Sequence, residues 1–233
     1  MIPVLIVPVL NRPELMFQML KSLGHEVEEI VVIDNGGALD GISGEAGETI
    51  ISLPHNAGVS AAWNLGMKVT PTAPWWLIVN HDIQFGEGDL DRLVDMVDED
   101  LDTHYFICGM AAFALTRHTL DKVGWFDENF HPAYDEDLDW DRRAKLAGSE
   151  RIEVGFTGSH VGSASIMADP DLRYRNGITH AANDAYYARK WGGIKQGGET
   201  FLTPFNRGGH IGDWRLEPDR LREQAWPRSR QTE

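Results

Sequence analysis

Cysteine is almost missing from this chain of 233 residues, which contains only Cys108. One thiol cannot close an internal disulfide, so the sequence excludes a disulfide-stabilised scaffold and fits a reducing compartment, for which we expect the cytoplasm. Long apolar runs are missing too, since stretches such as residues 2–10 fall well short of the roughly 20 residues that a membrane span requires. The N-terminus also lacks the basic lead of a signal peptide. We therefore expect no membrane span and no signal peptide.

Basic residues are scarce as well. Lysine and arginine number 21 against 36 aspartates and glutamates, which gives a formal net charge of −15. An acidic body repels the phosphate backbone of nucleic acid, so DNA or RNA is a poor candidate for the main partner. The arginines between residues 196 and 233 nevertheless keep nucleic acid from being excluded as a partner.

The length and composition are those of one large globular domain. Hydrophobic residues make up 42% of the chain and charged residues 24%, which is ordinary for a folded protein. From residue 196 onward, glycine, proline and arginine dominate. We expect a single domain over residues 1–195 and an irregular tail, residues 196–233, packed on or near it.

Short apolar runs alternate with helical patterns along the chain. Residues 2–9 form a β-branched run typical of a strand that is buried on both faces of a parallel sheet. Asn11 is then placed to cap a helix that begins with Pro13 and ends at Gly24. Further strands are expected at 29–34, 49–53, 75–80 and 105–115, and helices at 59–68, 116–123 and 170–191. This order predicts an α/β fold with an open, mostly parallel sheet flanked by helices.

Polar side chains follow each of the first four expected strands. In an open α/β sheet, ligands bind at the carboxyl ends of the strands, so these side chains are expected to share one rim. They are Asn11, Arg12, Asp34, Asn35, His55, Asn56, Asn80, His81 and Asp82. The turn at residues 8–13 has neither the glycine-rich basic loop of a sugar nucleotidyltransferase nor the G-x-G-x-x-G of a dinucleotide-dependent oxidoreductase. Both of those enzyme classes are therefore disfavoured.

An unusually dense group of acids lies between His131 and Arg143. Five carboxylates fall within the seven residues from Asp135 to Asp141, at the start of an expected helix. Acids in a first helical turn interact well with the unpaired N–H groups there, but this explains only some of them. Like charges this close are otherwise unfavourable, so the others indicate a cation site or an ionised base beside an incoming hydroxyl.

The order of several motifs resembles the inverting nucleotide-sugar glycosyltransferases of family 2, which have the GT-A fold. The matching segments are residues 7–14, 31–36, 56–66, 80–82, 124–128, 136–139 and 160–163. Together they cover about residues 1–193, and their order makes the resemblance specific. The resemblance implies a Rossmann-like nucleotide-binding half fused to an acceptor-binding half. It also implies transfer of a sugar from a UDP- or dTDP-sugar to an acceptor hydroxyl, with inversion at the anomeric carbon.

The same resemblance assigns the catalytic base. Asp137 matches the second acid of the family's Glu–Asp pair, which Glu136 begins. A carboxylate within hydrogen-bond reach removes the proton of an acceptor hydroxyl as the new bond forms. Trp125, His131 and Trp140 flank this pair and are expected to contact the acceptor, with core packing the equal alternative for the tryptophans.

Donor contacts are expected at the rim. Asp34 ends a buried strand at the position that contacts the nucleotide base in the family. A carboxylate there can accept a hydrogen bond from the imide N–H of uracil or thymine. The alternative is an Asp-Asn-Gly turn in which Asp34 bonds its own backbone. Asn56 and Gly58 precede a helix whose free N–H groups are expected to face a diphosphate or sugar hydroxyls, with simple capping as the alternative. The other expected nucleotide-sugar contacts are Pro8, Val9, Asn11, Arg12, Asn64, Asn80 and His81.

The triplet Asn80-His81-Asp82 stands where the family usually has an Asp-x-Asp triplet that holds a divalent cation on the diphosphate. Asp82 can still bind a hard cation, whereas Asn80 adds no charge, so weak metal affinity is expected. His160 resembles the family's downstream histidine that completes the metal shell, and a purely structural histidine is the alternative. The expected cofactor is Mn²⁺ or Mg²⁺.

These assignments favour an enzyme, a metal-dependent hexosyl- or deoxyhexosyltransferase. The sequence does not distinguish between four kinds of acceptor: a glycan, a lipid-linked sugar, a protein side chain and a modified nucleobase. A hypothesis from another class is a catalytically inactive sugar-binding module. The amide at Asn80 favours that alternative, whereas the presence of Asp82 and Asp137 opposes it.

Overall fold

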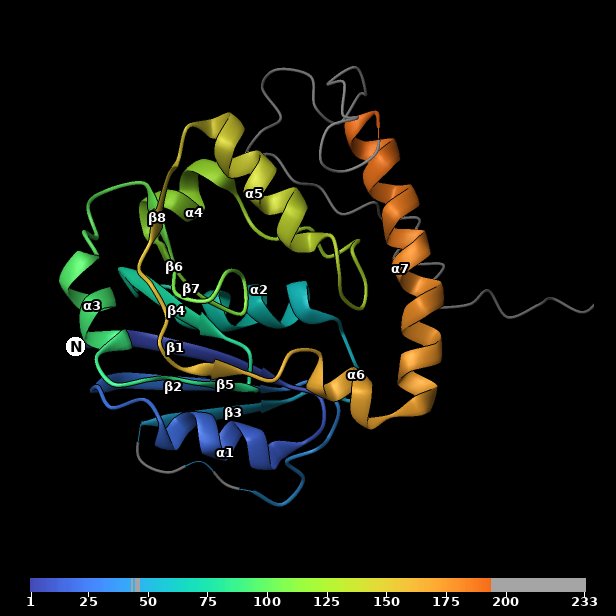
Figure 1. Ribbon diagram of the computed structural model, residues 1–233, viewed down its shortest axis with the longest axis horizontal. Helices are drawn as coiled ribbons and strands as arrows, with labels where there is room; N and C mark the ends of the chain where they lie inside the picture. The colour runs from blue at the N-terminus through green and yellow to red at the C-terminus, as the bar shows by residue number, and fades with distance from the viewer. Residues whose placement is uncertain (43, 45–46, 194–233) are drawn as a thin grey trace, which may run out of the picture.

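The computed structural model describes residues 1–42, 44 and 47–193. Its centre is a seven-stranded sheet with the order β3-β2-β1-β4-β7-β6-β8 (Figure 1). The strands that pair in parallel at one end of this order are β1 (Ile2–Val9), β2 (Val27–Asp34), β3 (Glu48–Ser52) and β4 (Trp75–Val79). β7 (Ala112–Thr116) is antiparallel to β4 and to β6 (Thr103–Phe106), and β8 (Glu150–Glu153) is parallel to β6. The prediction of an α/β fold with an open, mostly parallel sheet is confirmed.

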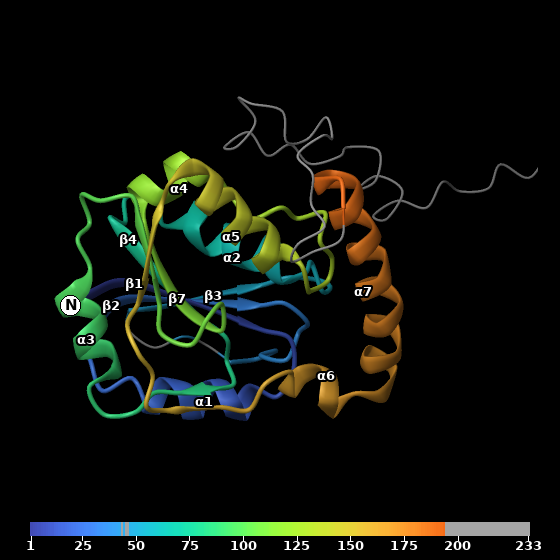
Figure 2. The same ribbon diagram turned by 45° about the horizontal axis from the view of Figure 1, so that its top comes forward.

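Both faces of the central strands are buried, which explains their continuous apolar sequence. Leu5 and Val7 of β1 belong to the core cluster that includes Met19 of α1 (Pro13–Lys21). Ile6 points to the other face and belongs to the cluster that includes Trp63 of α2 (Val59–Val69). Helix α1 therefore covers one face of the sheet, and α2, α4 (Arg117–Val123) and α5 (Glu136–Ala147) cover the other (Figure 2).

Helix α2 approaches β1 so closely that only glycine fits at one position. A Cβ atom added to Gly66 would lie 2.4 Å from Cγ2 of Ile6, far inside van der Waals contact. The missing side chain lets the helix settle on the strand. This contact fixes α2 relative to β1 and so places the start of α2 near the carboxyl ends of the strands.

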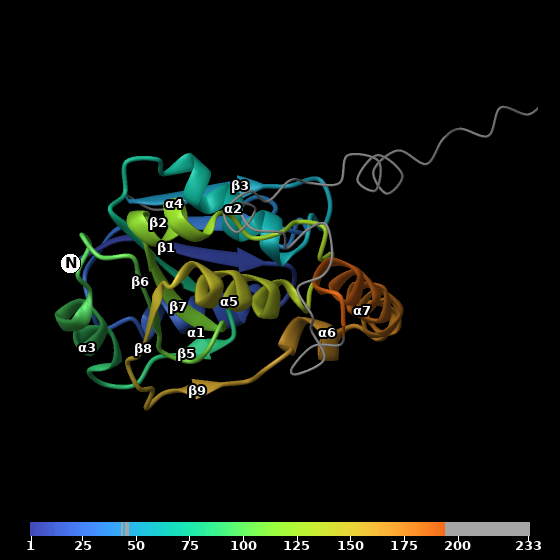
Figure 3. The same ribbon diagram turned by 90° about the horizontal axis from the view of Figure 1, so that it is seen from above.

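Two further helices lie beyond the carboxyl ends of the parallel strands. They are α6 (Ala164–Ala168) and α7 (Pro170–Trp191), seen at the same end of the sheet in Figures 1 and 3. A two-stranded sheet of β5 (Ile83–Gln84) and β9 (Ser159–His160) leads into α6, and α3 (Asp89–Met96) lies at the opposite end of the molecule. The rim of the sheet is thus enclosed by elements from the second half of the chain.

The expected helix at residues 170–191 agrees with α7, but two local predictions were wrong. The expected strand at 105–115 is two antiparallel strands, β6 and β7, because the chain turns back near Gly109, which has a φ of 52°. Asn11 does not cap α1: Arg12 holds the cap position with a left-handed φ of 57°, and the Asn11 amide donates to the Ser165 carbonyl at 3.1 Å.

The expected tail, residues 196–233, and the domain end at residue 195 lie outside the described residues. Among the helices that are described, none is long and apolar enough to cross a bilayer.

Candidate active site

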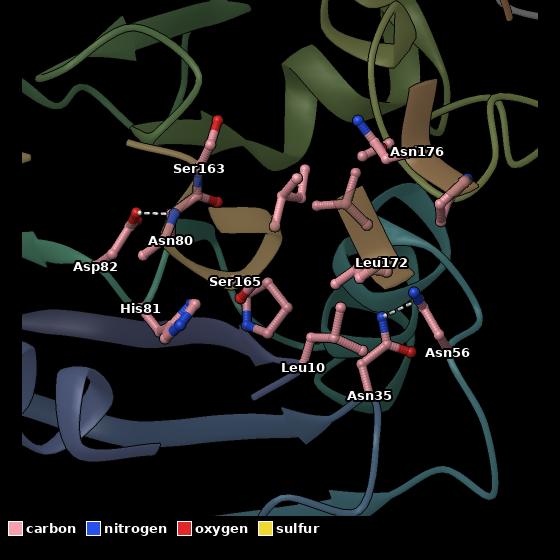
Figure 4. Close-up of a pocket in the computed structure, with 16 residues that line it drawn as sticks. Leu10, Asn35, Asn56, Asn80, His81, Asp82, Ser163, Ser165, Leu172 and Asn176 are labelled. Carbon is pink, nitrogen blue, oxygen red and sulfur yellow. Dashed lines mark hydrogen bonds between the residues drawn. The ribbon is translucent and has the colours of Figure 1, made fainter. Parts of the chain in front are cut away.

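A pocket lies between the carboxyl ends of the parallel strands and the α6–α7 pair (Figure 4). The strand side of this pocket consists of Pro8, Leu10, Asn35, Asn56, Val59, Asn80, His81 and Asp82. The facing side consists of Pro132, Ala133, residues 163–166, Leu172 and Asn176. The structure thus brings together polar residues from three strand ends that the sequence places far apart.

Asp82 lines one end of the pocket and lies next to His160, which is 78 positions further along the sequence and is not itself a lining residue. The pairing of Ile83 in β5 with His160 in β9 brings the two side chains together, and Nε2 of His160 lies 3.3 Å from Oδ1 of Asp82. The second carboxylate oxygen of Asp82 accepts a hydrogen bond from the amide of Ala164 at 3.3 Å. An oxygen and an imidazole nitrogen at this separation form a donor pair that suits Mn²⁺ or Mg²⁺.

His81 presents an unused polar atom to the same pocket. Its residue is only 7% exposed, and its Nε2 has no hydrogen-bond partner among the residues that the structure describes. Burial lowers the pKa of the His81 imidazole, so the ring is neutral. A neutral ring nitrogen that lines a pocket can donate to or accept from a polar ligand.

Amide side chains shape the other end of the pocket. Nδ2 of Asn35 donates to Oδ1 of Asn56 and to the Gly58 carbonyl, each at 3.2 Å. Oδ1 of Asn56 also accepts from the amide of Gly58 at 2.9 Å. These bonds fix the loop before α2, and the first helical N–H, that of Val59, donates to the carbonyl of Pro132 at 2.8 Å. Asn56 lines the pocket, whereas Gly58 supports the loop behind it.

Asp34 does not line the pocket, contrary to the expected contact with a base. Its side chain is fully buried, and its carboxylate accepts from the amides of Ala38 at 2.9 Å and Leu39 at 3.2 Å. The hydroxyl of Ser52 donates to the same carboxylate at 3.4 Å. The carboxylate therefore serves the turn after β2, as the alternative interpretation expected, and its neighbour Asn35 is the residue that reaches the pocket.

Three other expected ligand contacts are core residues. Val9 is fully buried in β1. Asn64 is fully buried, and its amide ties α2 to the next loop through the Phe126 carbonyl at 2.9 Å and Glu128 at 2.8 Å. Trp140 is also fully buried and donates its indole N–H to the carbonyl of Gly124 at 3.1 Å. Their positions correct the assignments of Val9 and Asn64 to the donor and of Trp140 to the acceptor.

The remaining expected contacts do not line the pocket. Arg12 forms an ion pair with Glu14 on the surface. Trp125 is partly buried, with Nζ of Lys68 5.3 Å from the centre of its ring. His131 lies beside the pocket, where its Nε2 is 3.2 Å from the carbonyl oxygen of Asn56.

Glu136 and Asp137 begin α5, directly after a segment that contributes Pro132 and Ala133 to the pocket wall. Asp137 is half-buried, and its Oδ1 accepts from the amide of Leu138 at 2.8 Å. Glu136 is buried, and this burial, with the charge of Asp137 next to it, raises the pKa of the Glu136 carboxyl well above its usual range. The Glu–Asp pair thus combines a buried acid of raised pKa with a more accessible carboxylate.

Other acids of this region have structural partners. Nζ of Lys190 lies 2.7 Å from Oδ2 of Asp127 and 2.7 Å from Oδ1 of Asp139. Arg143 pairs with the other oxygen of Asp139 at 2.9 Å. These buried contacts tie the end of α7 to α5, so the acid cluster divides into structural members and the Glu136–Asp137 pair.

Sequence reasoning missed the pocket residues of the second half, chiefly Ala133, Ser163, Leu172 and Asn176. Asn176 is 8% exposed, although it lies in a helix of largely polar composition. The side of α7 that faces the strands depends on how the helix docks, which local sequence does not encode. The burial of Asn176 among exposed residues of α7 would have pointed to the pocket, but this burial is apparent only in the folded structure.

Comparison with known proteins gives a family match. The model for Glycosyl transferase family 2 matches residues 4–140, more than half of the chain. A galactofuranosyl glycosyltransferase of Leishmania donovani is 48% identical over 42 residues, which are 18% of this chain and 10% of that protein. The chain thus spans only a tenth of the length of this curated relative.

Solved structures share the fold at low sequence identity. The mannosyltransferase PcManGT from Pyrobaculum calidifontis, in complex with GDP-Man and Mn²⁺, has a TM-score of 0.56 and 15% identity, covering 78% of this chain and 64% of that one. TarS 1-349 of S. aureus, in complex with UDP, has a TM-score of 0.52 and 16% identity, with 78% and 65% covered. Glucosyl-3-phosphoglycerate synthase from Mycobacterium tuberculosis, in complex with Mn²⁺ and UDP-Glc, has a TM-score of 0.53 and 14% identity, with 80% and 78% covered.

This chain spans just under two thirds of the first two of these structures, and at such identities the likeness is one of fold. The family model, in contrast, matches the sequence itself over more than half of the chain, and this match shows the family. The chain belongs to glycosyl transferase family 2 and has the GT-A fold.

Proposed function

We propose that this protein transfers a sugar from a UDP- or dTDP-sugar to an acceptor hydroxyl, with inversion at the anomeric carbon. The observation that carries this proposal is the Asp82–His160 pair, which lies at one end of a pocket at the strand ends, with a Glu–Asp pair beyond the facing wall. The similar structures with GDP-Man, UDP or UDP-Glc support a nucleotide-sugar donor. Family membership supports transfer as the reaction.

Asp82 and His160 are the residues that would hold a divalent cation. Their oxygen and nitrogen atoms lie 3.3 Å apart, and the side chain of Asp82 is 5% exposed, so the carboxylate is shielded from water. A bound Mn²⁺ or Mg²⁺ would supply Lewis-acid stabilisation of the charge that develops on the leaving diphosphate. Asn80 lines the same wall as a neutral amide and can hydrogen-bond the ribose or diphosphate without adding charge.

The rest of the pocket binds the donor through neutral groups. Pro8, His81 and Asn56 line it, and none of the described lining residues is a lysine or an arginine. Asp34 contributes indirectly, because its carboxylate holds the loop after β2 through the amides of Ala38 and Leu39, next to the pocket residue Asn35. Neutralisation of the diphosphate therefore depends on the cation, which is the physical reason to expect metal dependence.

Asp137 is assigned to the acceptor side as the general base. Its carboxylate accepts the proton of the acceptor hydroxyl as that oxygen attacks the anomeric carbon and the nucleoside diphosphate leaves from the opposite face. Burial and the charge of Asp137 raise the carboxyl pKa of Glu136, which favours its neutral form and lessens charge repulsion beside the base. His131, which lies beside the pocket, and Trp125 are assigned to the acceptor.

A second candidate function is a sugar-binding module without turnover. The observation that favours it is Asn80, an amide at the place where an acid would strengthen metal binding. The two functions differ in whether donor binding depends on the cation and leads to release of a nucleoside diphosphate.

A thermal-shift screen tests the donor site. The ligands are UDP, UDP-glucose, UDP-galactofuranose, GDP-mannose and dTDP-rhamnose, each with and without Mn²⁺. A UDP- or dTDP-sugar should stabilise the wild type by roughly 2–3 kcal/mol at about a hundred times its dissociation constant, and Mn²⁺ should enhance the effect.

Asp82→Ala should lose the Mn²⁺-dependent part of this stabilisation. Asp95→Ala, which removes an exposed acid of α3 at the far end of the molecule, should keep it. Equal stabilisation of wild type and Asp82→Ala by Mn²⁺ and donor would remove Asp82 from the site. A wild type that none of the five ligands stabilises would contradict the donor assignment.

A further inference from the structure

The segment from His131 to Asp135 connects the pocket to the Glu–Asp pair. Pro132 and Ala133 line the pocket, and α5 begins at Glu136, three positions after Ala133. Only Tyr134 and Asp135 separate the pocket wall from the first turn that carries Asp137. The conformation of this segment therefore sets the position of Asp137 relative to a bound donor.

The backbone of this segment is held in an unfavourable conformation. Tyr134 has a φ of 78° and Asp135 a φ of 72°, both in the left-handed region that non-glycine residues rarely adopt. Two consecutive residues of this kind persist only when surrounding contacts determine them. The structure shows which contacts do so.

Two elements hold the segment from opposite sides. On the donor side, the amide of Val59 donates to the Pro132 carbonyl at 2.8 Å. On the other side, Nδ2 of Asn183 in α7 donates to the carbonyls of Ala133 at 2.9 Å and Tyr134 at 3.1 Å. Asn183 is fully buried, so water does not compete for these two bonds.

Helix α7 is itself firmly anchored beyond this point. Lys190 bridges Asp127 and Asp139, and the indole of Trp191 donates to Oδ1 of Asp139 at 2.8 Å. Asp139 lies in α5, so α7 has a defined position relative to the helix that Asp137 begins. Asn183 thus holds the connecting segment from an element whose own position is fixed.

We propose that Asn183 is a positioning residue for the reaction: by holding the carbonyls of Ala133 and Tyr134, it fixes the turn that carries Asp137 to the acceptor side of the pocket. This inference rests on the proposed function, since it assumes that Asp137 is the base. Asn183 itself touches no reacting atom. Its contribution is to turnover and not to donor binding, because the donor end of the pocket is formed by the strand ends.

The test compares Asn183→Leu with Tyr186→Phe. Leucine keeps the approximate size of asparagine but cannot donate to the two carbonyls. Tyr186→Phe removes another buried hydrogen bond of α7, the one from its hydroxyl to Asp127 at 2.8 Å, without touching the turn. Both variants, the wild type and Asp137→Asn are assayed with Mn²⁺ for release of nucleoside diphosphate from the four sugar donors named above: UDP-glucose, UDP-galactofuranose, GDP-mannose and dTDP-rhamnose. Amide hydrogen exchange over residues 131–138 is measured in parallel.

We expect Asn183→Leu to lower kcat at least tenfold and to change the donor KM by less than twofold. Its exchange protection over residues 131–138 should fall, whereas Tyr186→Phe should keep both kcat and this protection. A variant Asn183→Leu with normal kcat, alongside an inactive Asp137→Asn, would overturn the positioning role and leave the proposed function standing. Loss of kcat to the same extent in Tyr186→Phe would also overturn it, because the effect would then be one of general packing. A wild type that releases nothing from any donor would overturn the proposed function and the role of Asn183 with it.

Discussion

The two walls of the pocket are built in different ways. The strand wall depends on the parallel register of β1, β2 and β4, which many backbone hydrogen bonds define. The facing wall, made by the 131–135 segment, α6 and α7, depends on a few side-chain contacts, such as those of Asn183 and Lys190. A single substitution should therefore disturb the facing wall more than the strand wall. The proposed base, Asp137, follows the wall that is easier to disturb.

The acids behind the facing wall differ among themselves as well. Asp127 and Asp139 are buried and neutralised by Lys190, whereas Glu136 has a raised pKa because burial is accompanied by neighbouring acids. Pairing makes the first two structural. The raised pKa of Glu136 favours its neutral form, so the proposed proton acceptor is its neighbour Asp137. The comparison predicts different consequences when each kind of charge is removed.

The largest effect is expected when the ion network behind the facing wall is broken. Lys190→Met leaves the buried carboxylates of Asp127 and Asp139 without their shared cation, which should cost about 3–5 kcal/mol in the free energy of unfolding. Urea denaturation measures this loss. Lys122→Met, which breaks the exposed pair with Asp102, should cost no more than about 1 kcal/mol. Equal losses in the two variants would refute the structural role of the buried network.

The next largest effect is expected at the base. Asp137→Asn keeps the shape of the side chain but removes its capacity to accept a proton, so turnover should fall by at least about a hundredfold. Donor affinity should not change, because the strand wall is untouched. Asp141→Asn is the control, since Asp141 lies in the same helix but pairs with Arg151 on the surface at 3.0 Å. Turnover of Asp137→Asn near the wild-type value would exclude Asp137 from the mechanism.

A smaller effect is expected on the strand wall at Asn80. Asn80→Asp adds a carboxylate near Asp82 and should tighten Mn²⁺ binding by about tenfold while turnover stays detectable. Isothermal titration with Mn²⁺ in the presence of UDP measures the change. Unchanged affinity would show that position 80 does not face the cation, and the amide would then carry no information about metal dependence.

The last prediction concerns pH and lies away from the pocket. Burial lowers the pKa of His104 to about 4, below the usual value of about 6.5 for histidine. Between these values the unfolded chain binds a proton that the folded chain does not, so stability is complete above about pH 6.5 and falls as the pH drops towards 4. His104→Gln should flatten this part of the profile of Tm against pH, whereas the exposed His55→Gln should not. A parallel profile for wild type and His104→Gln would contradict the assignment.

The strand wall was largely predictable from sequence, and the facing wall was not. Pro8 lies near the end of one apolar run, Asn56 and Asp82 follow others, and the parallel arrangement of those runs brings their ends together. Asn64 was assigned to the donor because it lies in a segment that resembles the family, and Trp140 to the acceptor because aromatic faces pack on sugar rings. Both side chains instead satisfy buried backbone groups, and only the fold decides between the two uses.

The role of α7 shows the second limit of sequence reasoning. Its length was predicted from periodicity and caps, yet the periodicity does not reveal that Asn176 faces the pocket and Asn183 the 131–135 segment. Those facts depend on the docking angle of the helix, which contacts distant in sequence determine. The reversal between β6 and β7 was missed for a similar reason, since a continuous apolar run carries no sign of a change in direction.

Release of nucleoside diphosphate tests the central claim most directly. The wild type is incubated with UDP-glucose, UDP-galactofuranose and dTDP-rhamnose, with Mn²⁺ or with EDTA, and the released UDP or dTDP is quantified, with Asp82→Ala and Asp137→Asn in parallel. The proposed function predicts slow release from at least one donor even without an acceptor, because water can take the place of the acceptor hydroxyl beside the base. This release should be stimulated by Mn²⁺ and strongly reduced in both variants. No release from any donor, together with micromolar binding of a glycan, would contradict the transferase and establish the sugar-binding module instead.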